Sequence, residues 1–410
     1  MWKIISTLIF GFMFFFQLQA EVLTGIEVLK QSNFNILEGK RVGLLTNPTG
    51  VDKNLKATVD ILHEAKNVNL VALFAPEHGV RGDEYAGVKF NDAKDSRTGL
   101  PVYSLHGNVR KPTAEMLKNV DVIVYDIQDI GCRSYTFISS LGLLMEAAAE
   151  NDKEVVVLDR PNPLGGLKVE GPLVEKGFFS FVSQYNIPYV YGLTCGEFAQ
   201  MINNEGMNKK ACKLIVIQMK GWRRSMTFVQ TGLPWVMTSP HIPQVSSAMA
   251  YPLSGIVGEL NAISIGVGYT LPFETFAAEW VTSSEVLAEA LNALNLKGIR
   301  FRPITYKPFY AIGKGKVMRG VQVFVTDYDK VMLSEVQFYV LQELHRLYPS
   351  KDPFKLGMLK NYNMFDNVCG SNKVRTMFGK RFVFDDLKDY WRKDTDAFSK
   401  FSKKYWMYEK

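Results

Sequence analysis

Five short apolar segments, separated by stretches of helical character, constrain the fold of this chain more than any other feature. They span residues 41–46, 69–74, 121–126, 155–159 and 214–218. Strands that are apolar along their whole length are typical of a parallel sheet buried on both faces. The helical patterns between them cover residues 57–65, 113–117, 139–150 and 196–204. The sequence therefore predicts an α/β domain with a Rossmann-like, doubly wound parallel sheet.

The pattern changes after about Thr238, where three prolines follow within 15 residues. Beyond them, helices are expected over residues 283–294 and 334–347 and an alternating strand over residues 317–325. A chain of 410 residues usually forms more than one domain, with ligands at the interface. We therefore expect a second, smaller α+β domain.

The expected division has three parts. Residues 1–20 carry Lys3, an apolar run and a small residue, Ala20, which is the layout of a cleavable export signal. The apolar run is shorter than the roughly 20 residues that a membrane span needs. Residues 21–238 form the Rossmann-like domain and residues 239–410 the smaller one. The mature protein is expected in a periplasm or outside the cell, without a membrane span.

Charge and cysteine content exclude several classes of protein. The formal net charge of +7 is spread along the chain, so nucleic-acid binding is not expected, whereas an anionic substrate is compatible with it. The four cysteines are widely spaced, which argues against a disulfide framework or a zinc ribbon. Buried free thiols are expected, with one bridge as the alternative after export.

Polar clusters follow four of the predicted strands. They occupy residues 46–50 (TNPTG), 75–79 (APEHG), 125–129 (YDIQD) and 159–163 (DRPNP). In an open α/β sheet the ligand lies at the carboxyl ends of the strands. We therefore expect the four clusters to converge on one crevice.

Glu77 is the first catalytic candidate. The proline before it and Gly79 after His78 predict a turn that projects the carboxylate at a strand end. Such a carboxylic acid can protonate a leaving-group oxygen if burial raises its pKa. The alternative is that Glu77 caps the turn or pairs with Arg81. His78 is expected mainly to support the loop.

Three aspartates could supply the second carboxyl group that glycoside hydrolysis uses, namely Asp126, Asp129 and Asp159. Strand-end aspartates also cap helices, so each has a structural alternative. Arg133 and Arg160 could hold a substrate carboxylate in a two-pronged contact, or pair with a neighbouring aspartate. Spacing in the sequence leaves these alternatives, and retention or inversion at the sugar, open.

Other chemistries find little support in the sequence. The five histidines are scattered and no H-E-x-x-H is present, so no metal site is expected. There is no G-x-S-x-G nucleophile motif. The G-x-G at Gly266 and Gly268 lacks a third glycine and lies outside the predicted Rossmann-like part. No organic cofactor is expected either.

The ordered motifs together resemble the bacterial exo-β-N-acetylmuramidases of the NamZ type, formerly a family of unknown function. The resemblance covers nearly the whole mature chain. It is carried by Leu45–Gly50, Pro76–Gly79 with Arg81 and Gly82, Tyr125–Asp129 with Gly131, Arg133, Tyr135 and Thr136, Asp159–Pro163 with Gly165 and Gly166, Glu170–Pro172, Gly192–Thr194 with Gly196 and Glu197, Gly232–Trp235, Ser239–Pro243, Pro272–Glu274, Phe365 with Asp366, and Gly370 with Ser371.

The resemblance implies a Rossmann-like domain and a smaller domain with the active cleft between them. It implies hydrolysis of the β-1,4 bond of a terminal, non-reducing N-acetylmuramic acid, without a metal or organic cofactor. The catalytic glutamate of the family falls on Glu77. The lactyl carboxylate of the substrate gives Arg133 or Arg160 a role. Three positions depart from the commoner family pattern, which has arginine at Val267 and Leu271 and histidine at Tyr191.

We therefore expect Glu77 to act as general acid, with Asp126 or Asp129 as base, nucleophile or electrostatic stabiliser. Substrate contacts are expected from Asn47, Arg81, Gln128, Arg133, Tyr135, Asp159, Arg160, Asn162 and Glu170. From the second domain, His241 and Glu274 are expected to close one end of the cleft. The alternatives are a non-catalytic wall-saccharide-binding protein, and an esterase or amidase, which lacks its nucleophile signature here.

Overall fold

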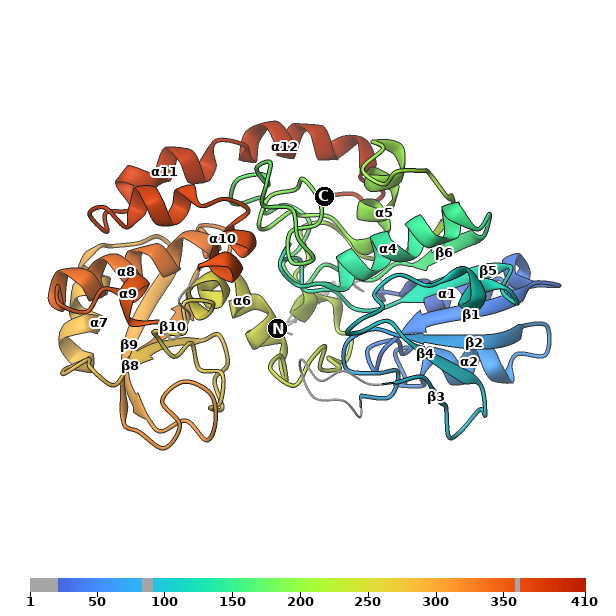
Figure 1. Ribbon diagram of the computed structural model, residues 1–410, viewed down its shortest axis with the longest axis horizontal. Helices are drawn as coiled ribbons and strands as arrows, with labels where there is room; N and C mark the ends of the chain where they lie inside the picture. Colours follow the sequence, from blue (N-terminus) through green and yellow to red (C-terminus); the bar gives the residue numbers. More distant parts are fainter. Residues whose placement is uncertain (1–20, 83–90, 358–361) are drawn as a thin grey trace, which may run out of the picture.

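The computed structural model describes residues 21–82, 91–357 and 362–410. Figure 1 shows two lobes, one built around a large sheet and the other around a small sheet with helices. The expected export signal, residues 1–20, lies outside the described residues. In the part of the chain that is described, no helix combines the length and apolar character that crossing a bilayer requires.

The large sheet has seven strands in the order β3-β4-β2-β1-β5-β6-β7. Its neighbours pair in parallel, apart from the short edge strand β3 (Ala93–Lys94), which runs antiparallel to β4. The other strands are β1 (Arg41–Thr46), β2 (Asn69–Ala75), β4 (Pro101–Ser104), β5 (Val122–Asp126), β6 (Glu154–Leu158) and β7 (Lys213–Ile217). The five strands predicted from the sequence are confirmed, and the strand order reverses between β1 and β5, where α/β sheets bind ligands.

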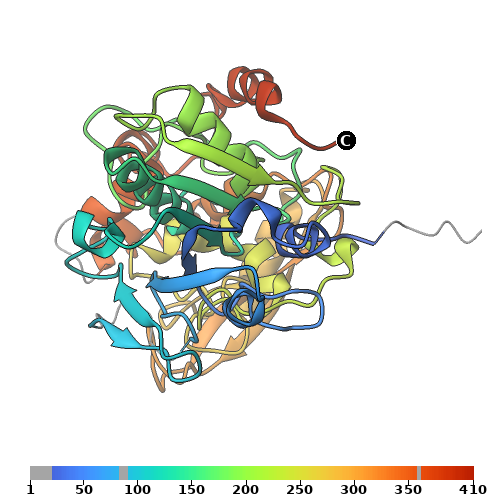
Figure 2. The ribbon, with the colours of Figure 1, turned by 90° about the vertical axis from the view of Figure 1, so that its right-hand side faces the viewer.

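Helices cover both faces of this sheet, as Figure 2 shows from the side. The helices are α1 (Gly25–Gln31), α2 (Thr58–Glu64), α3 (Ala114–Leu117), α4 (Phe137–Glu150) and α5 (Cys195–Asn204). One apolar core joins the sheet to α4 and α5, and another joins its opposite face to α1 and α2. The doubly wound prediction is therefore confirmed.

The second lobe contains an antiparallel sheet in the order β8-β10-β9. Its strands are β8 (Thr275–Ala278), β9 (Ile299–Tyr306) and β10 (Met318–Val325), and its helices are α6 (Val245–Gly258), α7 (Ser284–Ala293), α8 (Val336–Leu347), α9 (Pro353–Leu356) and α10 (Asn363–Cys369). These elements share one large apolar core. The α+β character expected for this part is confirmed.

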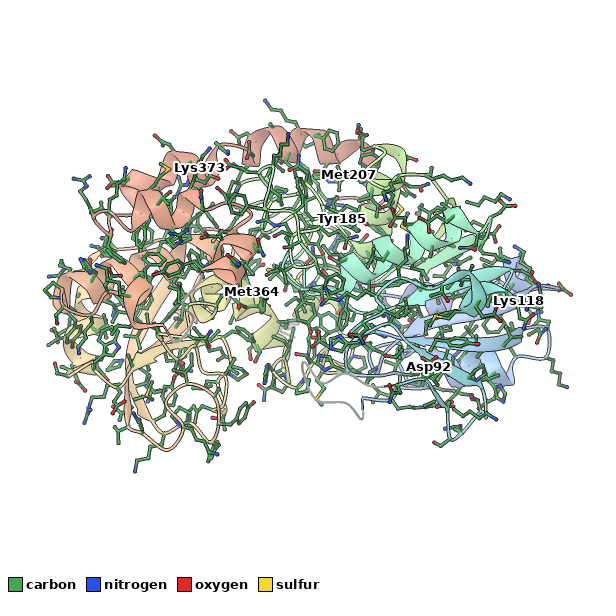
Figure 3. All side chains as sticks on the ribbon, viewed as in Figure 1. Asp92, Lys118, Tyr185, Met207, Met364 and Lys373 are labelled. Atoms are coloured by element: carbon green, nitrogen blue, oxygen red, sulfur yellow. The ribbon has the colours of Figure 1, made fainter. Side chains whose placement is uncertain are left out.

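The end of the chain returns to the first lobe. Helix α11 (Asp385–Arg392) packs Trp391 into the core of the second lobe, whereas α12 (Thr395–Ser402) packs Phe398 into the core of the first. Figure 1 shows α12 running across the top of the molecule, and Figure 3 shows Tyr185, which belongs to the same core, near it. Residues 395–410 are thus spatially part of the first lobe, although we expected them to pack on the second.

All four cysteines are buried and free. This is the outcome expected from their spacing, and no disulfide ties the lobes together. The lobes are held together by a shared apolar core, to which Ile130, Leu164 and Tyr189 of the first lobe belong, and by the polar contacts described below.

Candidate active site

The turn after β2 presents Glu77 at the carboxyl edge of the large sheet. The amide of Gly79 donates to the carbonyl of Pro76 at 3.1 Å, and His78 has a φ of +77°. A positive φ at the third residue is the geometry of a type II turn, and it is strained for any residue but glycine. Glu77 is half-buried and His78 is buried. The turn predicted from the proline and the glycine is therefore present.

Glu77 lies close to side chains from two other segments. Burial raises the pKa of Tyr135 well above its usual value, and the charges of Asp129 and Glu77 raise it further. Burial lowers the pKa of His241, as does the charge of His78, whereas the charge of Glu77 opposes this shift. The hydroxyl of Tyr135 donates to Thr238 at 2.6 Å. The charge of Glu77 thus acts on Tyr135 of the first lobe and on His241 of the crossing segment, residues 235–243, which leads from the first lobe to helix α6 of the second.

The two carboxylate oxygens of Asp129 differ in their hydrogen bonds. Its Oδ2 accepts hydrogen bonds from the amide of Gly131 at 2.7 Å and from the hydroxyl of Tyr191. Its Oδ1 is buried and meets no hydrogen-bond donor among the described residues. Burial raises the pKa of Asp129 to about 6. Such a carboxyl changes its protonation state close to neutral pH, which is useful for acid-base or electrostatic catalysis.

Asp126, the other candidate after β5, is sealed into the protein. It is fully buried and forms a two-pronged ion pair with Arg160, with N–O distances of 2.5 and 2.9 Å. Thr58 donates a further hydrogen bond to it. The expectation that Arg160 binds a substrate carboxylate is not supported, since the alternative ion pair is what forms.

Asp159 and Asn162, after β6, also hold the fold together. Asp159 is fully buried and accepts hydrogen bonds from Thr194 at 2.7 Å and Gly196 at 2.8 Å, so it caps α5. The hydroxyl of Tyr408 reaches it from the C-terminus, and burial raises its pKa to about 6. Asn162 donates to the carbonyl of Leu193 at 2.9 Å. The structural alternative that the sequence left open for Asp159, a helix cap, is therefore the one that forms, whereas Asn162, expected to contact substrate, holds the loop before α5.

Arg133 and Glu170 tie the two lobes together. Arg133 is 1% exposed, and its guanidinium donates to Ser183 and to the carbonyls of Pro172, Ile187 and Val368. Glu170 is 2% exposed and accepts the amides of Leu333 and Ser334, before α8. These contacts span 39 to 235 residues of sequence, so sequence analysis could not find them. Both side chains are inaccessible to a substrate, contrary to expectation.

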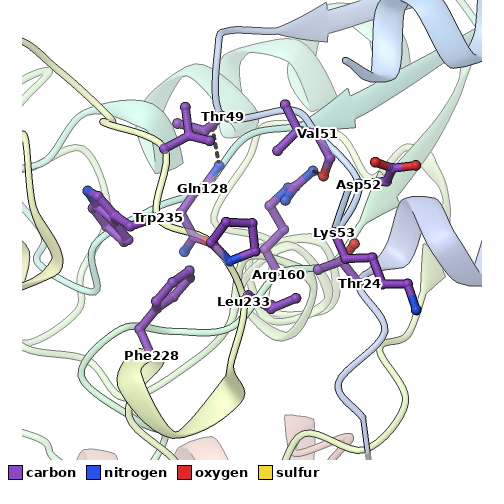
Figure 4. A pocket seen from close by; sticks show the side chains of 12 residues that line it. Thr24, Thr49, Val51, Asp52, Lys53, Gln128, Arg160, Phe228, Leu233 and Trp235 are labelled. Carbon is purple, nitrogen blue, oxygen red and sulfur yellow. Dashed lines mark hydrogen bonds between the residues drawn. The ribbon is translucent and has the colours of Figure 1, made fainter. Parts of the chain in front are cut away.

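A small hollow of about 350 Å³ lies at the switch point of the sheet. Thr49, Gln128 and Arg160 converge on it, and Trp235 faces them from the crossing segment (Figure 4). Gln128 donates to the carbonyls of Asp129 and Pro161, so its amide braces the loops. Part of the predicted crevice therefore exists, but its floor is closed by hydrogen bonds between the loops themselves.

The remaining predicted residues are dispersed. Asn47 accepts the amide and hydroxyl of Thr49, and its buried Nδ2 finds no acceptor in the described ranges. Arg81 pairs with Asp60 at 3.0 Å and Asp95 at 2.8 Å, so its charge is already balanced. Glu274 accepts a hydrogen bond from Ser246, and burial raises its pKa.

Sequence analysis missed Tyr310 and Glu259. Tyr310 stacks on His241 with ring centroids 5.9 Å apart, and Glu259 lines a hollow beside that histidine. Neither lies in a motif, so no sequence signal marked them. Two of the departures from the family pattern also lie at these sites, since Tyr191 contacts Asp129 and Val267 lines the same hollow.

Within the described ranges, no group of histidine, cysteine, aspartate or glutamate side chains is arranged to hold a metal ion. The chemistry that this arrangement offers is that of carboxyl groups: a half-buried glutamate on a strained turn and an aspartate with a raised pKa, with a tyrosine affected by both charges. Two carboxyl groups around one polar site are the equipment of glycoside hydrolysis.

Comparisons with known proteins point to one family. Family models described as "Exo-beta-N-acetylmuramidase NamZ" match residues 42–246 with the N-terminal part and residues 249–408 with the C-terminal part. The chain is 43% identical over 388 residues to the peptidoglycan beta-N-acetylmuramidase NamZ of Bacillus subtilis (strain 168). That match covers 95% of this chain and 92% of the relative.

Two solved structures of DUF1343 family proteins from Bacteroides fragilis NCTC 9343 share the fold. One is 59% identical with a TM-score of 0.92, and the other is 29% identical with a TM-score of 0.75. In both cases the match covers 95% of this chain and 99% of the solved chain. The similarity therefore includes both lobes and their arrangement.

Proposed function

The chain belongs to the exo-β-N-acetylmuramidase NamZ family, and from this premise we propose that it is a glycoside hydrolase of peptidoglycan. It releases terminal N-acetylmuramic acid from the non-reducing ends of β-1,4-linked fragments. One observation carries the proposal: Glu77 and Asp129 follow the parallel strands β2 and β5, so both carboxyl groups lie at the same edge of the large sheet, and Tyr135 follows Asp129 in the same loop.

Glu77 protonates the glycosidic oxygen of the leaving group. It is the less buried of the two carboxyl groups, and the turn projects it from the end of β2. Proton donation to the leaving group is worth about 10²- to 10⁴-fold in rate. His241 and Tyr135 orient the sugar whose glycosidic oxygen receives the proton. Tyr135 belongs to the first domain and His241 to the second, so polar groups of both domains contact the sugar.

Asp129 stabilises the positive charge that develops on the sugar ring in the oxocarbenium-like transition state. Its spare oxygen supports this role, since a buried carboxylate interacts more strongly with charge than an exposed one. Asp126 does not fit the role, because Arg160 already neutralises it. The pair Glu77 and Asp129 is therefore preferred over Glu77 and Asp126.

We also propose that the protein is exported, acting in a periplasm or outside the cell. The support is the layout of residues 1–20, and a wall-degrading enzyme would meet its substrate there. Edman sequencing of the mature protein should begin at Glu21. A protein that retains Met1 and stays inside the producing cell would contradict this part.

Product analysis on the disaccharide N-acetylmuramyl-β-1,4-N-acetylglucosamine tests the function. We expect equimolar release of the two sugars, and the Glu77→Gln variant should be slower by roughly 10³-fold, since glutamine keeps the shape but donates no proton. The control is Glu115→Gln, at a carboxylate that is 84% exposed, which should hydrolyse normally. Binding without hydrolysis by the wild type would favour a saccharide-binding protein, and near-normal turnover by Glu77→Gln would remove it from the mechanism.

A further inference from the structure

A second hollow, of about 740 Å³, opens in the C-terminal domain beside His241. Helix α6, the residues that follow it and the loop between β9 and β10 form its walls. His241 is the side chain shared with the candidate active site, where it experiences the charge of Glu77. The hollow therefore shares His241 with the candidate active site and lies in the second domain.

The lining of this hollow has the chemistry of a site for an uncharged sugar. Ile265 and Phe273 supply apolar surface, and Tyr251 and Asn261 supply polar groups. None of the described residues that line it is a lysine or an arginine, and its carboxyl group is Glu259. Burial raises the pKa of Glu259 to about 6. An anionic ligand would meet repulsion here without a compensating cation.

Two exposed aromatic side chains, called the rim below, directly precede Ala311, which lines the hollow. Phe309 is 70% exposed and Tyr310 is 48% exposed. Tyr310 stacks on His241, and Phe309 stacks on Tyr269 with centroids 6.2 Å apart. Ring faces carry partial negative charge and attract the C–H groups of a pyranose.

The backbone holds this rim in place. The amide of Phe309 donates to the carbonyl of Gly268 at 2.7 Å. Gly268 has a φ of +91°, and a Cβ atom there would lie 2.0 Å from the carbonyl oxygen of Tyr310. The loop between β9 and β10 thus rests directly on a glycine backbone. A rim fixed in this way loses little freedom when a ligand binds.

We propose that this hollow is the subsite for the N-acetylglucosamine on the leaving-group side of the scissile bond. The inference rests on the proposed function. An enzyme that removes the terminal non-reducing sugar has no sugar beyond it on that side, so a second sugar site must bind the leaving group. Of the two sugars in the substrate, N-acetylglucosamine is the uncharged one, and the described lining of the hollow offers apolar surface and a carboxyl group but no lysine or arginine.

The test compares two substrates. One is the disaccharide, and the other is N-acetylmuraminyl fluoride, whose leaving group is a single atom and does not fill a leaving-group subsite. Val267→Trp places a large side chain into the hollow and should raise KM for the disaccharide at least about tenfold. The kcat/KM for the fluoride substrate should stay within about twofold. Phe309→Ala should raise KM for the disaccharide about fivefold.

Phe324→Ala is the matched control. Phe324 is 44% exposed on β10 and pairs with Arg300, at the end of the hairpin opposite to the loop of Phe309. It should leave both substrates unaffected. If Val267→Trp impairs both substrates equally, the hollow holds muramic acid and the proposal is overturned. Unchanged kinetics on both substrates would overturn it as well.

Calorimetry separates this subsite from the proposed function. Free N-acetylglucosamine should bind the wild-type protein, and Val267→Trp should weaken that binding at least about tenfold. Failure of the wild type to hydrolyse either substrate would contradict the proposed function, while this titration would still decide the subsite. Equal affinity of the two proteins for N-acetylglucosamine would reject the subsite, whatever the enzymatic result.

Discussion

Asp126 and Asp129 lie three residues apart at the carboxyl end of β5, yet the protein treats them differently. Asp126 forms an ion pair with Arg160 and accepts a hydrogen bond from Thr58, so both of its carboxylate oxygens are bound within the protein. Asp129 shares one oxygen with Gly131 and Tyr191 and leaves the other without a donor among the described residues. Asp126 is therefore a structural brace, whereas Asp129 is the carboxylate that we propose to interact with the substrate.

The difference shows what a position at a strand end does and does not imply. Parallel topology brings the polar clusters to one edge of the sheet, as expected. Whether a side chain there performs chemistry depends on partners that arrive from distant segments. Arg160 neutralises Asp126 from 34 residues away, and no cation does the same for Asp129 in the described part of the chain. Substitutions at either aspartate test this difference.

The largest effect is expected for Asp126→Ala, which leaves the Arg160 guanidinium buried without its partner. Removing one member of a buried pair costs about 3–5 kcal/mol. Urea unfolding at pH 7 measures the loss. The control is Asp121→Ala, which breaks a pair between Asp121 and Arg41 that is about 40% exposed, and should cost about 1 kcal/mol or less. If Asp126→Ala lowers the free energy of unfolding no more than Asp121→Ala does, Asp126 does not brace the fold.

Asp129→Asn should act on catalysis instead. We expect kcat/KM on the disaccharide to fall about 10²-fold, because the amide carries no negative charge to stabilise the transition state. The wild-type rate should also fall as the pH drops through about 6, where Asp129 takes up its proton. Asp129→Asn should lose this acid limb. If Asp129→Asn reacts at the wild-type rate, another carboxyl group stabilises the transition state.

Stability should move in the opposite direction to activity. Burial raises the pKa of Asp129 from 3.8 to about 6, so the folded state keeps a proton that the unfolded state has already released. Stability therefore declines as the pH rises from about 4 to about 6 and is constant above. Burial raises the pKa of Asp159 to about 6 in the same way. Urea unfolding across this range should show a shallower decline in Asp129→Asn than in the wild type.

The sequence was informative about the fold wherever elements are uniformly buried. The strands of the large sheet came from unbroken apolar runs, and their bounds differ from the predicted ones by about one residue. The short strand β4 has no such run, and neither does β9, which carries Arg300, Arg302 and Pro303 on exposed positions. Helix α6 contains Pro252, which pointed away from a helix. Tertiary packing overrode local preference there.

The site was predictable in part. The turn at Glu77 depends on adjacent residues, so its proline and glycine sufficed to predict it. The roles of Arg133, Asp159 and Glu170 depend on partners far away in the sequence, which the local residue types and motifs that suggested substrate contacts for them do not show. Residues in a shared motif can be retained for architecture as easily as for chemistry.

The smallest expected effect sharpens the comparison by tuning Asp129 without removing it. The hydroxyl of Tyr191 donates to the carboxylate and favours its charged form, so Tyr191→Phe should raise the pKa of Asp129 further. A hydrogen bond to a charged group is worth enough to move the acid limb of kcat/KM upward by about one pH unit. At pH 8, well above the limb, the rate should be nearly unchanged. If the acid limb of kcat/KM lies at the same pH in Tyr191→Phe as in the wild type, the group that titrates near pH 6 is not Asp129. Glu259 would then be the next carboxyl group to test, because burial also raises its pKa to about 6.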